Sequence, residues 1–117
     1  MIVHQNYNES GYLYDIGLLK LESKIKFNNF TKAVKLPMKY ENTISYENCT
    51  GIASGWGKIS EKQDKSKNLL YVSLKIINND VCEKYYKNPF HPSLLCTSTK
   101  GKRSICTGDS GGPFVLK

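Results

Sequence analysis

Short runs in which apolar and polar residues alternate dominate this chain, and clusters of turn-forming residues separate them. In the clearest run, over 70–76, every second residue is aliphatic, and this period of two predicts a strand with one buried face. Positions 16, 18, 19 and 21 are all apolar, so both faces of the segment 16–21 are apolar. This pattern predicts a strand that is buried on both sides.

One short helix is predicted after the strand at 70–76. Asn79 or Asp80 is a suitable N-cap, because a short polar side chain there accepts a hydrogen bond from a backbone N–H of the first turn. The helix is expected to run through Tyr86 and to stop before Pro89, since the residue before a proline disfavours helical backbone. The pattern therefore predicts an all-β protein with one minor helix.

Glycine, proline and polar residues divide the chain further. Glycine-rich segments at 55–57 and 111–113 mark turns, and the polar, turn-rich segment 38–48 is the best candidate for a linker. Hydrophobic residues make up 39% of the chain and charged residues 23%, a composition typical of a globular protein. A length of 117 residues suffices for one small domain or for part of a larger one.

The charge balance narrows the possible partners. Seventeen Lys and Arg stand against 10 Asp and Glu, for a formal net charge of +7. The densest basic stretch, 58–67, is interrupted by Glu61 and Asp64, whereas a nucleic-acid surface more often clusters its cations on one face. We therefore expect a solvated, lysine-rich surface and no nucleic-acid partner, with a free-standing cationic binding module as the alternative. No apolar stretch reaches the roughly 20 residues that span a bilayer, so no membrane partner is expected.

Four cysteines indicate the compartment. They form no Cys-x-x-Cys pair, and neither histidine stands at a zinc-finger spacing, so no metal site and no cofactor are expected. Four cysteines in a short, turn-rich chain favour disulfides and an oxidising environment. Potential glycosylation sequons begin at Asn8, Asn29 and Asn48. These features predict a secreted, extracellular protein.

The hexapeptide 108–113, Gly-Asp-Ser-Gly-Gly-Pro, is the segment most informative about chemistry. Ser110 has glycine on both near sides, which allows a tight turn with an exposed hydroxyl. The backbone N–H groups of Gly108 and Ser110 can then converge on one point, as the stabilisation of a developing oxyanion requires. The alternative is a glycine-rich turn without chemistry.

With Cys106 before it, this hexapeptide resembles the nucleophile loop of the chymotrypsin/trypsin family of serine endopeptidases. Further segments resemble that family in the same order along almost the whole chain: 4–8, 15–21, 34–37, 53–57 and 101–113. The resemblance implies an all-β fold that is part of a double antiparallel β-barrel with one short helix. It implies that residues 1–37 form the last part of the first barrel, 38–48 an inter-barrel linker and 49–117 an incomplete second barrel.

The resemblance also implies roles for individual residues. Ser110 is the nucleophile of an acyl-enzyme mechanism, and Asp15 orients and supports a histidine base. Gly108 and Ser110 supply the N–H groups of the oxyanion hole. Asp109 pairs with the new N-terminal ammonium after zymogen cleavage. The structural alternatives are a strand-entry turn residue for Asp15 and an Asx-turn for Asp109.

Ser104 occupies the position at which the family places the floor of its primary specificity pocket. Trypsin-like members carry an aspartate there, which pairs with Arg or Lys of the substrate. A neutral hydroxyl leaves a desolvated cation without a partner, so we expect chymotrypsin-like cleavage after aromatic or large aliphatic residues. The expected partners are polypeptide substrates and protein inhibitors. Cys82 and Cys96 match a short-range disulfide pair of the family.

The chain departs from the family in the general base. The family carries a histidine in an Ala-Ala-His-Cys-like context well before the triad aspartate, and no such motif precedes Asp15. Neither His4 nor His91 is expected to be this base. We therefore expect an incomplete portion of the enzyme, inactive by itself because a serine without a base is a poor nucleophile. In this chain Cys49 and Cys106 are expected to be unpaired.

A second function remains open at this point. A non-catalytic homologue keeps the fold and acts as a binding or regulatory protein. Such homologues usually lose the nucleophile, whereas both Ser110 and Asp15 are present here. The endopeptidase is therefore the first hypothesis and the homologue the alternative.

Overall fold

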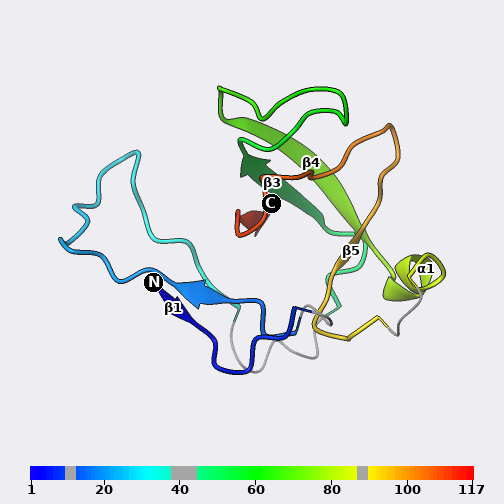
Figure 1. Cartoon of the computed structure of the whole chain (residues 1–117), viewed down its shortest axis with the longest axis horizontal. Helices are drawn as coiled ribbons and strands as arrows, with labels where there is room; N and C mark the ends of the chain where they lie inside the picture. The colour runs from blue at the N-terminus through cyan, green and yellow to red at the C-terminus, as the bar shows by residue number, and fades with distance from the viewer. Residues whose placement is uncertain (10–12, 38–44, 87–89) are drawn as a thin grey trace. The chain divides into compact units, whose positions relative to one another are not determined.

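A computed structural model of the chain describes residues 1–9, 13–37, 45–86 and 90–117 (Figure 1). The chain divides into two compact units, Met1–Thr43 and Ile44–Lys117. The predicted linker, 38–48, lies mostly outside the described residues.

The first unit contains a small antiparallel ladder. Strand β1 (Ile2–Val3) pairs with strand β2 (Gly17–Leu18), with Ile2 opposite Leu18. The prediction of a strand over 16–21 buried on both sides is wrong. The strand has only two residues, and Leu18 and Leu19 are 63% and 74% exposed. The reason is that β2 pairs with β1 alone among the described strands, and a two-stranded ladder has no second layer to cover its faces.

The second unit contains a four-stranded antiparallel sheet. Its strands are β3 (Thr50–Gly55), β4 (Leu70–Ile77), β5 (Cys96–Thr97) and β6 (Phe114–Leu116). They lie in the order β5-β4-β3-β6, and Figure 1 shows the two long strands, β3 and β4, side by side. Six residue pairs join β3 to β4, from Thr50 opposite Lys75 to Gly55 opposite Leu70. Strand β6 of this sheet directly follows the hexapeptide 108–113.

Strand β4 confirms the predicted strand, and its second half confirms the predicted buried face, whereas Leu70 at its start is 42% exposed. Leu74 and Ile76 are buried, while Lys75 between them is exposed and Tyr71 is 77% exposed. The strand continues one residue beyond the predicted segment, to Ile77. The buried side chains of the described residues are those of β3, β4 and β5: Ala53, Leu74, Ile76 and Cys96.

One short helix, α1 (Asn79–Glu83), follows β4 (Figure 1). Its N-cap is Asn78, whose Oδ1 accepts a hydrogen bond from the Asp80 N–H at 2.8 Å. The prediction of Asn79 or Asp80 as N-cap is therefore wrong by one or two residues. The physical reason is that the Asn79 side chain is engaged elsewhere, with the backbone of Leu94 and of the Cys96 strand.

The helix also ends earlier than predicted, at Glu83 instead of Tyr86. The N–H of Tyr85 donates to the Cys82 carbonyl at 2.9 Å, three residues back, so the chain tightens into a turn there. Pro89 lies outside the described residues. The predicted fold class, all-β with one short helix, is confirmed for the part of the chain that the structure describes. None of the described helical segments is long and apolar enough to cross a lipid bilayer.

Candidate active site

The loop that contains Ser110 is a double turn held by its own backbone. The Asp109 N–H donates to the Cys106 carbonyl at 3.0 Å, and the Gly112 N–H donates to the Asp109 carbonyl at 2.9 Å. Gly108 has φ +102° and Gly111 has φ +77°, values in the left-handed region that favours glycine. Ser110 lies exposed between these two bends.

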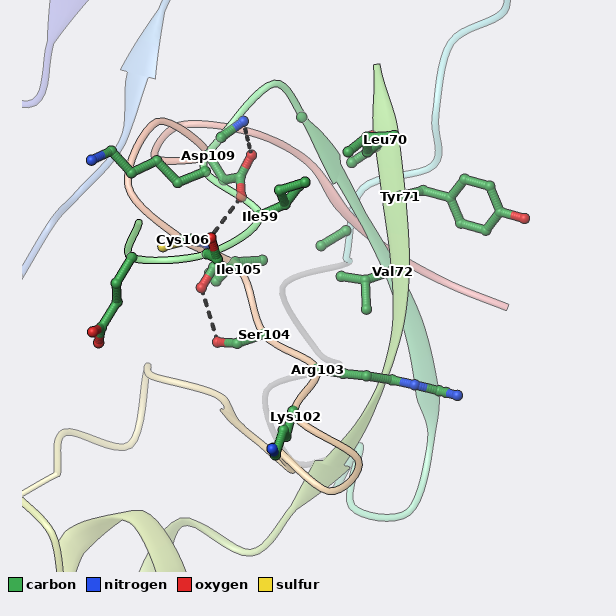
Figure 2. Close-up of a pocket in the computed structure, with 17 residues that line it drawn as sticks. Ile59, Leu70, Tyr71, Val72, Lys102, Arg103, Ser104, Ile105, Cys106 and Asp109 are labelled. Carbon is green, nitrogen blue, oxygen red and sulfur yellow. Dashed lines mark hydrogen bonds between the residues drawn. The ribbon is translucent and has the colours of Figure 1, made fainter. Parts of the chain in front are cut away.

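The side chain of Asp109 anchors this loop to the segment that follows strand β3. Its Oδ1 accepts the Gly57 N–H at 2.8 Å, and its Oδ2 accepts the Cys106 N–H at 3.0 Å (Figure 2). A Cβ on Gly55 or on Gly57 would overlap the carboxylate. The Gly-Trp-Gly segment, interpreted from sequence as a turn and as part of a family-like segment, therefore also contacts a half-buried carboxylate. Two glycines that flank one tryptophan were the available signal of this close approach.

Residues of the segment after Gly57 also contact the loop. The Lys58 N–H donates to the Thr107 carbonyl at 3.0 Å. The aliphatic stem of Lys65 covers Gly108, because a Cβ added to Gly108 would lie 2.8 Å from Lys65 Cε. The positive φ is the reason that favours glycine at 108, since the end of the flexible Lys65 side chain can move aside. No sequence signal identifies the contact with Lys65.

Two donors of the loop remain available to a ligand. Among the described residues, no acceptor receives a hydrogen bond from the N–H of Gly108 or from that of Ser110. The N–H of Asp109, which lies between them in sequence, is already bonded to Cys106. With respect to the described residues, both N–H groups are therefore unbonded donors in the loop that contains the exposed Ser110.

A cavity of about 710 Å³ opens beside the Asp109 carboxylate. Its apolar lining comes from β3, from β4 and from the segment before Asp109 (Figure 2): Ala53, Leu70, Val72 and Ile105. Lys58, Lys102 and Arg103 contribute cationic side chains to the lining. Ser104 also lines the cavity, and its hydroxyl donates to the Ile105 carbonyl at 2.9 Å.

Asp15 lies in the first unit, at the centre of a tight turn. The Ile16 N–H donates to the Tyr14 carbonyl at 2.7 Å, two residues back. The His4 N–H in turn donates to the Ile16 carbonyl at 3.2 Å and joins this turn to the end of β1. Asp15 itself is exposed.

Both histidines of the chain have local partners. His4 Nδ1 accepts the Asn6 N–H at 3.1 Å. His91 Nδ1 lies 2.7 Å from the Ser93 hydroxyl oxygen and accepts the Ser93 N–H at 3.2 Å. Neither of these interactions involves Ser110.

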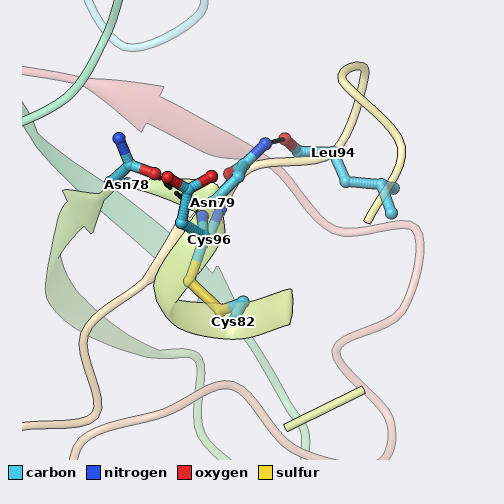
Figure 3. The surroundings of a disulfide bond; sticks show 6 residues. Asn78, Asn79, Cys82, Leu94 and Cys96 are labelled. Carbon is cyan, nitrogen blue, oxygen red and sulfur yellow. Dashed lines mark hydrogen bonds between the residues drawn. A yellow bond between two sulfur atoms is a disulfide. The ribbon is translucent and has the colours of Figure 1, made fainter. Parts of the chain in front are cut away.

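A disulfide joins Cys82 of α1 to Cys96 of β5 (Figure 3). Asn79 supports it: the side-chain amide donates to the Leu94 carbonyl at 2.8 Å, and Oδ1 accepts the Cys96 N–H at 3.2 Å. Cys49 and Cys106 are free thiols in the structure, as expected from the sequence. The support by Asn79 was missed, because three adjacent polar residues, 78–80, look alike in the sequence.

Comparisons with known proteins agree on one family. The trypsin family profile matches residues 1–117. Chymotrypsin-2 of Vespa crabro is 36% identical over 115 residues, which are 98% of this chain and 51% of that protein. A venom protease of Bombus pensylvanicus is 30% identical over 118 residues, covering 98% of this chain and 48% of its own length.

The similarity extends to a solved structure. Neuropsin, described as a serine protease expressed in the limbic system of mouse brain, matches with a TM-score of 0.85 and 28% identity. The match covers 99% of this chain and 52% of neuropsin. The chain therefore has the fold of part of a trypsin-like β-barrel protein, and it spans about half the length of the relatives it matches.

Proposed function

Because this chain belongs to the trypsin family of serine proteases, we propose that the protein carrying it is an endopeptidase that hydrolyses peptide bonds through an acyl-enzyme. The observation that carries the proposal is the loop 106–112. Ser110 in this loop is exposed. The N–H groups of Gly108 and Ser110 are not hydrogen-bonded within the described part of the chain, whereas the N–H of Asp109 between them in sequence is bonded to Cys106.

The proposed chemistry assigns one step to each group. The Ser110 oxygen attacks the scissile carbonyl carbon while a histidine takes the hydroxyl proton. The N–H groups of Gly108 and Ser110 bind the oxyanion of the tetrahedral intermediate. The intermediate collapses when the histidine returns the proton to the leaving amine, and water then releases the acyl group by the same route. Asp15 orients that histidine and stabilises its charged form.

The base is the missing group. His4 and His91 are the only histidines of the chain, and both are engaged with residues close to them in sequence. We propose that the parent protein supplies the base and that this chain alone does not hydrolyse peptides. Loss of a triad member reduces the rate by several orders of magnitude.

Asp109 and the cavity beside it support a further role. We propose that this carboxylate receives the N-terminal ammonium formed when the parent zymogen is cleaved. Two backbone N–H groups already orient the carboxylate, and the apolar lining of the cavity suits the side chain of the residue bearing the ammonium. The alternative, an Asx-turn, would place a side-chain oxygen of Asp109 on the N–H of Gly111, two residues on, and it accounts for neither of these two contacts.

Ser104 supports chymotrypsin-like specificity. The Ser104 hydroxyl is neutral and donates to a carbonyl of its own loop, so it offers no counter-charge to a substrate Arg or Lys. We propose that the parent cleaves after aromatic or large aliphatic residues, and its similarity to a chymotrypsin agrees with this.

The setting of the enzyme follows from the same family. We propose a secreted protein, supported by the disulfide and by the similarity to a venom protease. Its partners would be polypeptide substrates and protein inhibitors. Residues 1–37 and 49–117 would belong to the first and the second barrel, with 38–48 between them.

The test uses the full-length parent after activation, a fluorophosphonate probe and peptide p-nitroanilides. The expected result is labelling that Ser110→Ala abolishes, with faster hydrolysis after Phe or Leu than after Arg. The matched control is Ser98→Ala, a serine of the same unit outside the loop. Absence of labelling in the activated parent would support the alternative, a non-catalytic homologue.

A further inference from the structure

The residue before Asp15 has an unusual backbone conformation. Tyr14 has φ +55°, in the left-handed region that bulky side chains rarely adopt. Such a conformation persists only where the surrounding structure holds it, and it is frequent next to functional groups. Tyr14 is 55% exposed, so burial in a core does not hold it.

The ring of His4 lies against the ring of Tyr14. The two ring centroids are 4.8 Å apart and the planes are inclined by 11°, a stacked pair. The His4 ring is itself fixed, because its Nδ1 accepts the Asn6 N–H at 3.1 Å. The backbone of His4 is also fixed, by the bond from its N–H to the Ile16 carbonyl and by the bond from the Tyr7 N–H to its carbonyl.

These contacts hold the residues on both sides of Asp15 in the sequence. Tyr14 before it is held through its ring, and Ile16 after it is held through its carbonyl, in both cases by His4. The bond from the Ile16 N–H to the Tyr14 carbonyl then closes the turn, which sets the direction in which the Asp15 side chain leaves the backbone.

We propose that His4 is a positioning residue for Asp15: its ring holds Tyr14 in the left-handed conformation and so fixes the aim of the aspartate. The inference rests on the proposed function, in which Asp15 orients the histidine base. His4 acts here as an anchor of the turn, not as a base. Small displacements of a catalytic group reduce the rate strongly, so a loose turn lowers kcat more than it changes substrate binding.

The test compares four single variants, the double variant His4→Ala/Tyr14→Leu and one control of the activated full-length protein, measured on a Phe p-nitroanilide substrate. His4→Ala removes the stack, and His4→Phe keeps a ring there while it removes the acceptor of the Asn6 N–H. Tyr14→Leu removes the other ring, and Tyr14→Phe keeps it. Phe30→Ala is the matched control, since Phe30 is an aromatic residue of the same unit that is 99% exposed.

The expected result is a loss of kcat of about tenfold in His4→Ala and in Tyr14→Leu, with KM changed by less than about twofold. His4→Phe and Tyr14→Phe restore most of kcat relative to those two variants. The double variant His4→Ala/Tyr14→Leu loses no more than either single one, because the two rings act as one unit. Phe30→Ala behaves as the wild type.

The possible failures are distinguishable. The positioning role is overturned if the losses of kcat add up in the double variant, or if the kcat of His4→Ala equals that of the wild type. Either result leaves the proposed endopeptidase function intact. If His4→Ala does not fold, the comparison of Tyr14→Leu with Tyr14→Phe decides alone. An activated wild type that the fluorophosphonate does not label overturns the proposed function and this inference together.

Discussion

Replacement of Asp109 by alanine tests the anchor of the candidate active loop. The change removes the acceptors of two backbone N–H groups, those of Gly57 at 2.8 Å and of Cys106 at 3.0 Å. A hydrogen bond to a charged group contributes about 1.5–3 kcal/mol to the free energy of unfolding. Asp109 is only half-buried, so the lower end of this range applies to each bond. The expected loss in Asp109→Ala is about 3 kcal/mol.

Asp109→Asn separates the two bonds. Its single carbonyl oxygen accepts from one N–H, while its NH₂ group faces the other N–H and cannot accept from it. The expected loss is therefore about half as large, roughly 1.5 kcal/mol. Asp64→Asn is the matched control, because Asp64 is an exposed acid in the neighbouring segment 58–67.

The assay combines guanidinium chloride unfolding of the full-length protein with hydrogen exchange of individual amides. A loss of about 3 kcal/mol corresponds to roughly hundredfold faster exchange at Gly57 and Cys106. The order expected for that exchange is Asp109→Ala fastest, Asp109→Asn next, and Asp64→Asn equal to the wild type. Unchanged protection of both amides in Asp109→Ala would refute the anchoring role, whatever the change in global stability.

Three further substitutions test the packing around the site. Asn79→Ala leaves the buried N–H of Cys96 in β5 without its acceptor, so the free energy of unfolding in guanidinium chloride should fall by about 2 kcal/mol. A loss below about 0.5 kcal/mol would contradict the role of Asn79 in joining α1 to the segment 94–96. Gly57→Ala places a methyl group where the Asp109 carboxylate lies, so a loss of about 1–3 kcal/mol is expected, and a crystal structure with an unmoved carboxylate would argue against it. Leu74→Ala should lower the free energy of unfolding, measured by thermal denaturation, by about 2–5 kcal/mol. Leu69→Ala, at an exposed position, should change it by less than about 0.5 kcal/mol, and equal effects of the two substitutions would contradict the described core.

The success and the failure of the strand predictions have one physical cause. At 70–76 the alternation identifies the apolar face of the strand, and the second unit buries that face at Leu74 and Ile76, while Leu70 remains 42% exposed. At 16–21 the apolar residues indicate only that burial of either face of the strand would be favourable. Whether anything covers them depends on partners that the segment itself does not encode, and in this structure Leu18 and Leu19 remain exposed.

The helix shows the same limit on a smaller scale. Asn78, Asn79 and Asp80 are all competent N-caps, so local propensity cannot choose between them. The choice is made by the β5 segment, 15 and 17 residues away, whose carbonyl and N–H recruit the Asn79 side chain. Once Asn79 is engaged there, Asn78 is left to cap the helix.

The residues of the candidate site can be named from the sequence, and their roles stay predictions; the contacts that hold them could not be predicted. The proposed oxyanion donors and the groups that anchor Asp109 are backbone N–H groups, which every residue except proline possesses, so no residue type marks them. Only Gly57 and Gly108 among these four residues lack a Cβ, so the absence of a side chain marks two of the N–H groups and not those of Cys106 and Ser110. Gly57 and Asp109 are 52 residues apart, and the glycine is needed because the carboxylate occupies the space of its side chain. Glycine at 55 and 57 therefore reveals a close approach of the Asp109 carboxylate that the charged residues do not reveal.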